Sequence, residues 1–298
     1  MSNEPQLSVI QLTFADTTFE EDLALIAASG AGGIGVAEDK LRDGEDERHI
    51  AAFRASGLVA AGCVPTMPGH ISPLPIASQG VFTAGAESVD DRVGAMCKSV
   101  ERLAAFSPDS VAMITGSSEG YSRKDAWRLA VEGIREVGRV AAENSTRIAL
   151  EPTRDDLGID LSFLRSIPET IDFLDEVASP AVGLCYDLFH LWDTKDLLKH
   201  TERHADRIFS VQYCDARKPL RTGADRLVPG DGVVDIPGIL GALERGGFNG
   251  WYECEIFSDD GRWGTELPDS LWKLPPSELL DRAHAGFREA WAARRETS

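Results

Sequence analysis

The chain alternates between two kinds of segment along its length, and this alternation restricts the fold more than any other feature. Short apolar segments rich in β-branched residues recur at intervals of roughly 25–40 residues, each ahead of a longer segment with helical spacing. We predict strands over residues 7–14, 33–37, 58–64, 110–115, 147–151, 181–187, 207–213 and 251–257. We predict helices over residues 18–28, 45–56, 87–106, 123–143, 168–178, 194–203, 235–246 and 277–294.

Eight such units in 298 residues predict an α/β fold, the (β/α)₈ TIM barrel, as a single domain over residues 1–298. A doubly wound open sheet is the alternative, but no G-x-G-x-x-G motif follows the first predicted strand. The glycine-rich run at 30–33 comes after the first helix and is typical of a helix stop and a turn. Long connections at 65–86 and 215–234 leave C-terminal strand ends, where barrel enzymes place their active sites.

The charge balance limits the partners of the chain. Asp and Glu outnumber Lys and Arg by 49 to 30, so the formal net charge is −19, which disfavours nucleic acid and anionic membranes as partners. We expect a small-molecule substrate and a cation instead, and a homo-oligomer is compatible with the sequence. The start MSNEPQLSVI has no basic and apolar leader pattern, and no apolar run is long enough to cross a bilayer, so we expect a cytoplasmic protein.

Polar residues end four consecutive predicted strands. Glu151, Asp187, Gln212 and Glu255 stand at or near the ends of the fifth to eighth strands, and each can point into the barrel. Three carboxylates this close repel one another, and a shared divalent cation relieves the repulsion. Carboxylate and amide oxygens suit Mg²⁺, Mn²⁺ or Co²⁺. A single Glu at a strand end is more often a surface residue, so the pattern of four carries this prediction.

Several runs of the sequence resemble one known family. They are IALEP (148–152), VGLCYDLFHLW (182–192), VQYCDA (211–216), VPGDGVVDIPGIL (228–240) and GWYECEIF (250–257). Their order and spacing resemble the sugar phosphate isomerase/epimerase superfamily, the xylose-isomerase-like TIM barrels that include inosose isomerases and dehydratases. The resemblance implies one divalent metal ion held by Glu151, Asp187, Gln212 and Glu255, with Zn²⁺ as a further candidate. Many members have His where this chain has Gln212, and the Gln variant is found among 3-dehydroshikimate dehydratases.

The resemblance also implies the chemistry. In an isomerase or epimerase of a small polyhydroxy ketone or aldehyde, Glu151 and Glu255 would be the catalytic pair that moves a proton through an enediolate. A dehydratase on the same site, which expels a β-hydroxyl as water, is the alternative enzyme. A non-catalytic sugar-binding subunit is the alternative from another class, although the presence of both glutamates argues against it.

Other residues are weaker candidates. The resemblance makes His190 a substrate contact, and a histidine packed at the strand-to-helix turn is the alternative. It also points to Arg217 for a polar substrate group, although Arg221 and Arg226 are near enough to compete, and His70 could line the mouth of the pocket.

Glu253 shares the inward parity of Glu255, so it could replace Glu255 as the ligand if the strand register differs. The position of Glu255 just before the Ile-Phe pair favours Glu255. A buried Glu253 would then need a partner, and Arg147 is one candidate.

Overall fold

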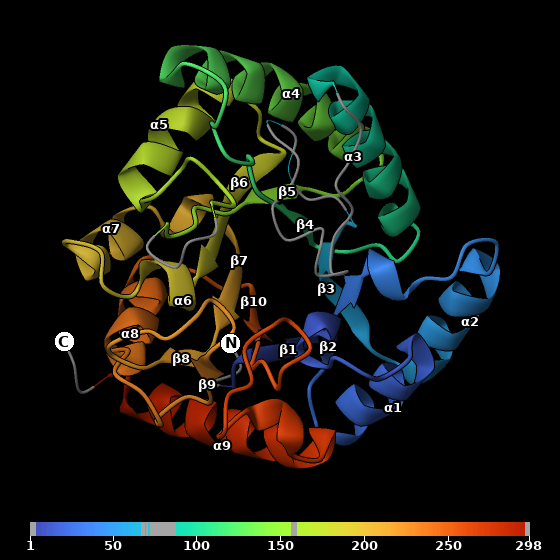
Figure 1. Ribbon diagram of the computed structural model, residues 1–298, viewed down its shortest axis with the longest axis vertical. Coiled ribbons are helices and arrows are strands. Elements are labelled where there is room, and N and C mark those ends of the chain that lie inside the picture. The colour runs from blue at the N-terminus through green and yellow to red at the C-terminus, as the bar shows by residue number, and fades with distance from the viewer. Residues whose placement is uncertain (1–3, 67–68, 70, 72–87, 156–159, 296–298) are drawn as a thin grey trace.

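The computed structural model describes residues 4–66, 69, 71, 88–155 and 160–295, and these form a closed parallel barrel surrounded by helices (Figure 1). The barrel strands follow the order β1-β10-β7-β6-β5-β4-β3-β2 around the ring, so the predicted (β/α)₈ fold is confirmed. The strands are β1 (Gln6–Ile10), β2 (Gly33–Ala37), β3 (Val59–Val64), β4 (Ser110–Met113), β5 (Ile148–Leu150), β6 (Val182–Asp187), β7 (Ile208–Tyr213) and β10 (Trp251–Cys254).

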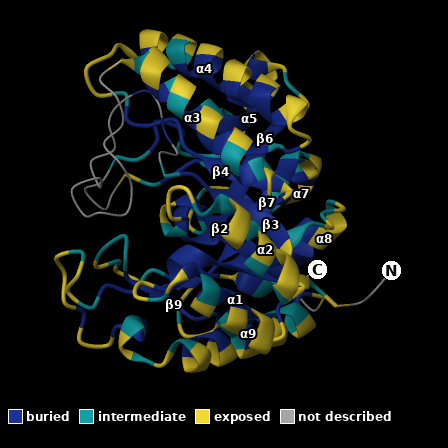
Figure 2. Ribbon diagram, turned by 90° about the vertical axis from the view of Figure 1, so that its right-hand side faces the viewer, coloured by how far each residue is buried: buried dark blue, intermediate teal, exposed yellow. Residues whose placement is uncertain are grey.

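The helices cover the outside of the barrel, with their exposed residues facing away from the strands (Figure 2). They are α1 (Phe19–Ala28), α2 (Asp46–Ser56), α3 (Val89–Ala104), α4 (Arg123–Glu143), α5 (Ile167–Val177), α6 (Leu188–Leu191), α7 (Leu197–Arg203), α8 (Ile236–Arg245) and α9 (Pro276–Ala293). Thr18 begins α1 with a capping box, in which its side chain and that of Glu21 each bond the other's backbone N–H. Within the described ranges, no helix combines the length and apolarity needed to cross a bilayer.

Several predicted strands are longer than the observed ones, and the barrel register explains this for the first and the last. The first strand stops at Ile10 because residues Gln11–Thr13 turn into a short 3₁₀ helix. Val9 pairs with Cys254, so β10 loses its neighbour on this side just where Glu255 begins. Glu255 is thereby released from the ladder with β1 while its N–H still donates to the Tyr213 carbonyl of β7 (3.1 Å).

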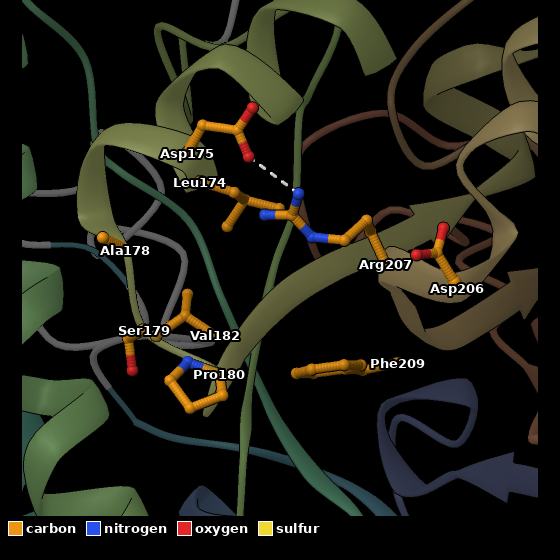
Figure 3. Close-up of a pocket in the computed structure, with 9 residues that line it drawn as sticks. All are labelled: Leu174, Asp175, Ala178, Ser179, Pro180, Val182, Asp206, Arg207 and Phe209. Carbon is orange, nitrogen blue, oxygen red and sulfur yellow. Dashed lines mark hydrogen bonds and ion pairs between the residues drawn. The ribbon is translucent and has the colours of Figure 1, made fainter.

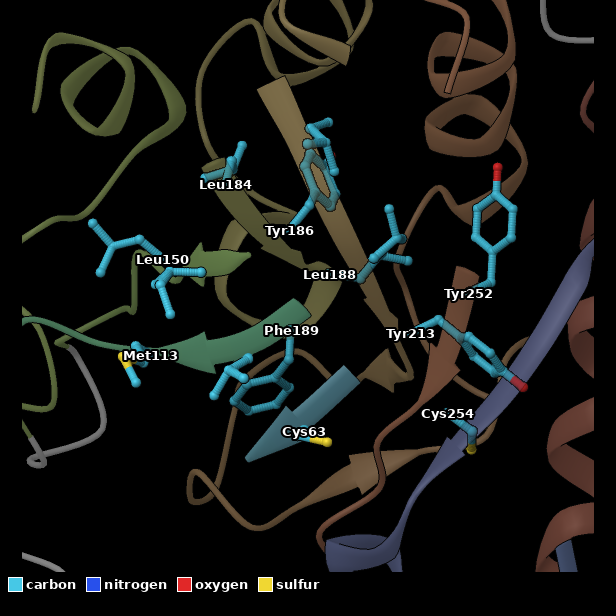
Figure 4. Close-up of a cluster of buried hydrophobic side chains, with 14 of the residues drawn as sticks. Cys63, Met113, Leu150, Leu184, Tyr186, Leu188, Phe189, Tyr213, Tyr252 and Cys254 are labelled. Atoms are coloured by element: carbon cyan, nitrogen blue, oxygen red, sulfur yellow. The ribbon is translucent and has the colours of Figure 1, made fainter. Parts of the chain in front are cut away.

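Alternate residues of each strand face two different apolar layers. One layer fills the barrel and includes Ile10, Ala37, Val64, Ala149 and Cys185. The other lies between strands and helices and includes Leu150, Leu184, Tyr186, Tyr213 and Tyr252 (Figure 4). The period of two therefore turns Cys185 and Asp187 of β6 inward while Leu184 and Tyr186 pack outward.

The long connection after β7 is a structured hairpin. Its strands are β8 (Asp215–Ala216) and β9 (Arg226–Leu227), which pair antiparallel. The buried Asp215 carboxylate accepts hydrogen bonds from the backbone N–H groups of Gly230, Gly232 and Val234 at 2.9–3.0 Å. A Cβ on Gly232 would lie 2.3 Å from Asp215 Oδ1, so this turn requires glycine. Asp215 therefore fixes the return of the hairpin toward α8.

Candidate active site

The predicted metal ligands come from four neighbouring strands at the same end of the barrel. Glu151 directly follows β5, Asp187 ends β6, Gln212 lies in β7 and Glu255 directly follows β10. These strands are consecutive in the ring, and Asp187 is in register with Gln212. Asp187, Gln212 and Glu255 are buried, and Glu151 is partly exposed.

His190 lies beside two of the carboxylates. One ligand atom each from Glu151, Asp187 and His190 lies within 4.8 Å of the others. His190 Nε2 is 3.6 Å from Glu151 Oε1 and 3.6 Å from Asp187 Oδ2. Asp187 Oδ1 accepts from the N–H of Phe189 (2.8 Å), so this carboxylate also starts the short helix α6, which carries His190.

The hydrogen bonds of His190 determine which nitrogen carries its proton. The backbone N–H of Arg154 donates to Nδ1 (3.3 Å), so Nδ1 is the acceptor and the neutral ring carries its proton on Nε2. Burial lowers the pKa of His190 to about 4, which keeps the ring neutral at physiological pH. His190 therefore offers an N–H donor toward Glu151 and Asp187, which suits contact with a substrate oxygen better than ligation of a metal.

Gln212 is held by groups on both sides of its amide. The Cys185 thiol donates to Gln212 Oε1 (3.4 Å), and Gln212 Nε2 donates to Glu255 Oε1 (3.5 Å). In this orientation the amide nitrogen faces Glu255. Ligation of a metal through Oε1 requires the amide to turn over, after which Nε2 can donate to the Cys185 sulfur.

Arg226 joins the carboxylates, and the sequence did not distinguish it from Arg217 and Arg221. Its Nη1 donates to Glu255 Oε2 (2.7 Å) and to Asp187 Oδ2 (3.0 Å), and the residue is only 3% exposed. Its guanidinium carbon lies 4.6 Å from the ring centre of Phe189 and 4.4 Å from that of Phe257. A sequence signal was available, because Arg226 lies in a strand-like R-L-V run just before the P-G-D-G turn.

Arg217, the predicted substrate contact, lies in a different ion-pair cluster. Its guanidinium contacts Asp225 and Asp269, each at 2.9 Å, and Arg221 pairs with the same two carboxylates. This cluster ties the hairpin tip to the loop after β10. A substrate role for Arg217 stays a prediction, and His70 lies outside the described residues.

Glu253 lies deeper in the barrel than Glu255 and has neutral partners. Its carboxylate accepts from the Ser210 hydroxyl (2.5 Å), the Gly62 N–H (3.0 Å) and the Ser8 hydroxyl (3.3 Å). The expected partner Arg147 is wrong: its Nε donates to the Asp109 carbonyl (3.1 Å), and its guanidinium covers the Phe209 ring at 4.2 Å. The alternation of strand residues correctly placed Glu253 inside the barrel. Arg147 lies one residue before β5, and its side chain turns to the outside.

The electrostatics of the site favour a bound cation. Burial raises the pKa of Glu151 well above its usual range, and the charges of Asp187 and Glu255 raise it further. Burial also raises the pKa of Glu255 to about 7; Arg226 opposes this rise and Asp187 adds to it. Without a cation these carboxyl groups therefore tend to take up protons, and a hard divalent ion, which their oxygens fit, would stabilise their charged forms.

A hollow of about 480 Å³ lies at the other end of the barrel (Figure 3). Val182 and Phe209, at the beginnings of β6 and β7, form part of its wall, beside the ion pair of Arg207 with Asp175 (2.8 Å). The polar cluster instead lies at the C-terminal strand ends, where TIM-barrel enzymes carry their chemistry.

Comparisons with known proteins agree with the barrel fold. Residues 23–289 match the family model described as xylose isomerase-like TIM barrel. An inosose dehydratase of Geobacillus thermodenitrificans is 29% identical over 153 residues, 46% of this chain and 49% of that protein. The matched region thus spans about half the length of this relative.

Two solved structures share the whole fold. A protein from Sinorhizobium meliloti 1021 superposes with a TM-score of 0.80 at 26% identity, covering 97% of this chain and 99% of that one. The IOLI protein, solved with a bound zinc atom, superposes with a TM-score of 0.77 at 17% identity, covering 96% and 98% of the two chains.

Proposed function

The chain belongs to the xylose isomerase-like TIM barrel family, and we propose that it is a metal-dependent enzyme that dehydrates a small, uncharged polyhydroxy ketone of the inosose class. The observation that carries the proposal is the group of three carboxylates, Glu151, Asp187 and Glu255, at one end of neighbouring strands. The inosose dehydratase relatives support dehydration as the outcome.

Glu151, Asp187, Gln212 and Glu255 would hold the divalent ion. When bound, such an ion polarises the ketone oxygen and acidifies the adjacent C–H. The carboxylate of Glu151 or Glu255 accepts that proton, and the other member of the pair returns a proton to the substrate. In the metal-free site, burial raises the pKa of Glu255 to about 7, which is the range of a group that exchanges protons at neutral pH.

The fate of the second proton separates two reactions. Delivery to a β-hydroxyl releases water and gives a dehydrated product, whereas delivery to carbon gives an isomer or epimer. The Nε2–H of His190 lies between Glu151 and Asp187, where it can hold a substrate hydroxyl in place. This donor supports dehydration. Isomerisation or epimerisation is the second candidate, supported by the placement of Glu151 and Glu255 on strands at either side of Asp187.

The arginines near the site support an uncharged substrate. All arginines of the loops 151–166 and 214–235 form ion pairs with carboxylates; they are Arg154, Arg165, Arg217, Arg221 and Arg226. Recognition of a phosphate ester ordinarily uses arginines whose guanidinium groups are available to the phosphate. We therefore expect inososes and free ketoses to be substrates in preference to their phosphate esters.

Turnover in H₂O and in D₂O, each followed by mass spectrometry, tests the proposal. In H₂O, protein stripped with EDTA and reloaded with Mn²⁺ should convert an inosose to a product 18 mass units lighter, with rising ultraviolet absorbance. Glu151→Gln and Glu255→Gln should each lose about 10²-fold or more in rate, while the exposed control Glu132→Gln keeps the wild-type rate.

The other outcomes discriminate between the alternatives. A product of unchanged mass in H₂O that is one mass unit heavier in D₂O, because it carries one solvent deuterium on carbon, would establish the isomerase or epimerase. Wild-type rates in both Gln variants, or full turnover in excess EDTA with metal loss verified, would refute this mechanism.

A further inference from the structure

We propose that Arg226 competes with the divalent ion for Asp187 and Glu255, and thereby sets how tightly the site binds metal. The inference rests on the proposed function only in taking these carboxylates as metal ligands. It concerns a positioning residue from the hairpin after β7, on none of the four ligand-bearing strands.

Asp187 already accepts hydrogen bonds from protein donors, one of which is Arg226. Asp187 Oδ1 accepts from the Phe189 N–H (2.8 Å), and Asp187 Oδ2 accepts from Arg226 Nη1 (3.0 Å). Both carboxylate oxygens are therefore engaged by protein donors. An ion that binds Asp187 through Oδ2 would share that oxygen with the guanidinium or take it over, and an ion at Oδ1 would share it with the Phe189 N–H.

Glu255 is engaged in the same way. Its Oε2 accepts from Arg226 Nη1 (2.7 Å), the same nitrogen that contacts Asp187. One guanidinium nitrogen thus contacts two of the carboxylates that would hold the ion. A divalent ion held by the same carboxylates would be repelled by the positive guanidinium, and such repulsion is strong in a buried site.

The surroundings of Arg226 keep it in this position. Its guanidinium carbon lies over the rings of Phe189 and Phe257, and the residue begins β9. The hairpin that contains β9 is fixed by Asp215 through the turn at Gly230 and Gly232. Because the aromatic rings and the backbone restrict the guanidinium, it cannot simply withdraw to solvent when metal arrives.

The charge balance predicts the consequence of removing Arg226. Three carboxylates carry three negative charges, and one guanidinium plus one divalent ion carry three positive charges. Without Arg226, the divalent ion faces one more uncompensated negative charge and no competing donor, so its affinity rises. Without metal, the same variant leaves the buried Asp187 and Glu255 and the partly exposed Glu151 without the guanidinium that contacts them or their neighbours, so the folded state is destabilised.

Metal binding and thermal melting test the inference without relying on turnover. EDTA-stripped wild type, Arg226→Met, Arg226→Gln and Arg226→Lys are titrated with Mn²⁺ in competition with a fluorescent chelator. Arg245→Met, which removes a surface arginine paired with Glu202, is the matched control.

We expect Arg226→Met and Arg226→Gln to bind Mn²⁺ about tenfold or more tighter than wild type, and Arg226→Lys and the control to bind within about threefold of it. Both neutral variants should melt below wild type in EDTA, and saturating Mn²⁺ should reduce that difference. If Arg226→Met does not fold, Arg226→Gln carries the same test.

Equal or weaker Mn²⁺ binding by a folded neutral variant, with wild type binding normally, would overturn the competition and leave the proposed function intact. Absence of Mn²⁺ binding by every protein in the set would overturn both.

Discussion

Glu253 makes the stability of the barrel depend on pH, and its replacement by Gln should remove that dependence. The carboxyl is 1% exposed, and burial raises its pKa to about 7 from an ordinary 4.5, although hydrogen bonds from Ser210, Gly62 and Ser8 oppose the rise. Below pH 4.5 both folded and unfolded chains carry the proton, and the contribution to stability is complete. As the pH rises from 4.5 to 7, the unfolded chain loses the proton first, so the free energy of unfolding falls.

The size of the effect follows from the shift. A difference of about 2.5 pKa units at about 1.4 kcal/mol per unit gives about 3 kcal/mol, most of it lost between pH 5 and 8. A glutamine side chain at this position would be neutral at every pH and of similar shape. Glu253→Gln should therefore keep its stability over this range better than wild type by about that amount.

Urea denaturation of both proteins at pH 5, 6, 7 and 8 measures this difference. Other titrating groups are common to both proteins, and the exposed Glu132→Gln serves as the control, with the pH dependence of wild type. Parallel curves for wild type and Glu253→Gln would refute the reasoning, because they would show that Glu253 titrates alike in the folded and unfolded chains.

Three further predictions follow from single contacts. Gln212→His should shift metal preference from Mn²⁺ toward Zn²⁺ because imidazole is the softer donor; an unchanged ratio in competition titrations would show that the carboxylates dominate. Gly183→Ala should destabilise the fold by about 1–3 kcal/mol, because the new Cβ would lie 2.6 Å from the Phe209 ring, and an unaltered melting temperature would contradict the crowding. Asp215→Ala should cost about 3 kcal/mol, since three backbone N–H groups, one of them buried at Val234, lose their charged acceptor; an unchanged midpoint in urea denaturation would disprove this.

The fold was predictable because the barrel repeats one local pattern. Most strands are short apolar runs and several helices have a capping residue, such as Thr18, Ser122 and Ser166, so the order of elements follows from local sequence. The same logic placed Glu151, Asp187 and Glu255 at the C-terminal strand ends, where the structure has them. Their roles as metal ligands stay predictions.

The partners of these residues depend on contacts that sequence periodicity does not contain. Arg226 reaches Asp187 across 39 positions, and the strand-like R-L-V run before the P-G-D-G turn does not show which carboxylates it contacts. The tautomer of His190 depends on a backbone N–H from the loop after β5. Parity put Glu253 inside the barrel but could not show that two serines and a glycine N–H, rather than Arg147, surround it.

The hairpin after β7 has two parts. The frame comprises Asp215, β8, β9 and the turn at 230–234, and the tip comprises residues 217–225. Asp215 secures the frame that presents Arg226, whereas the tip is attached at the surface through Arg217 and Arg221. Residues 218–224 could therefore be varied as one segment while Asp215 keeps the frame in place and Arg217 stays attached to Asp269. A loop library confined to this segment would leave Arg226 at its position beside the carboxylates.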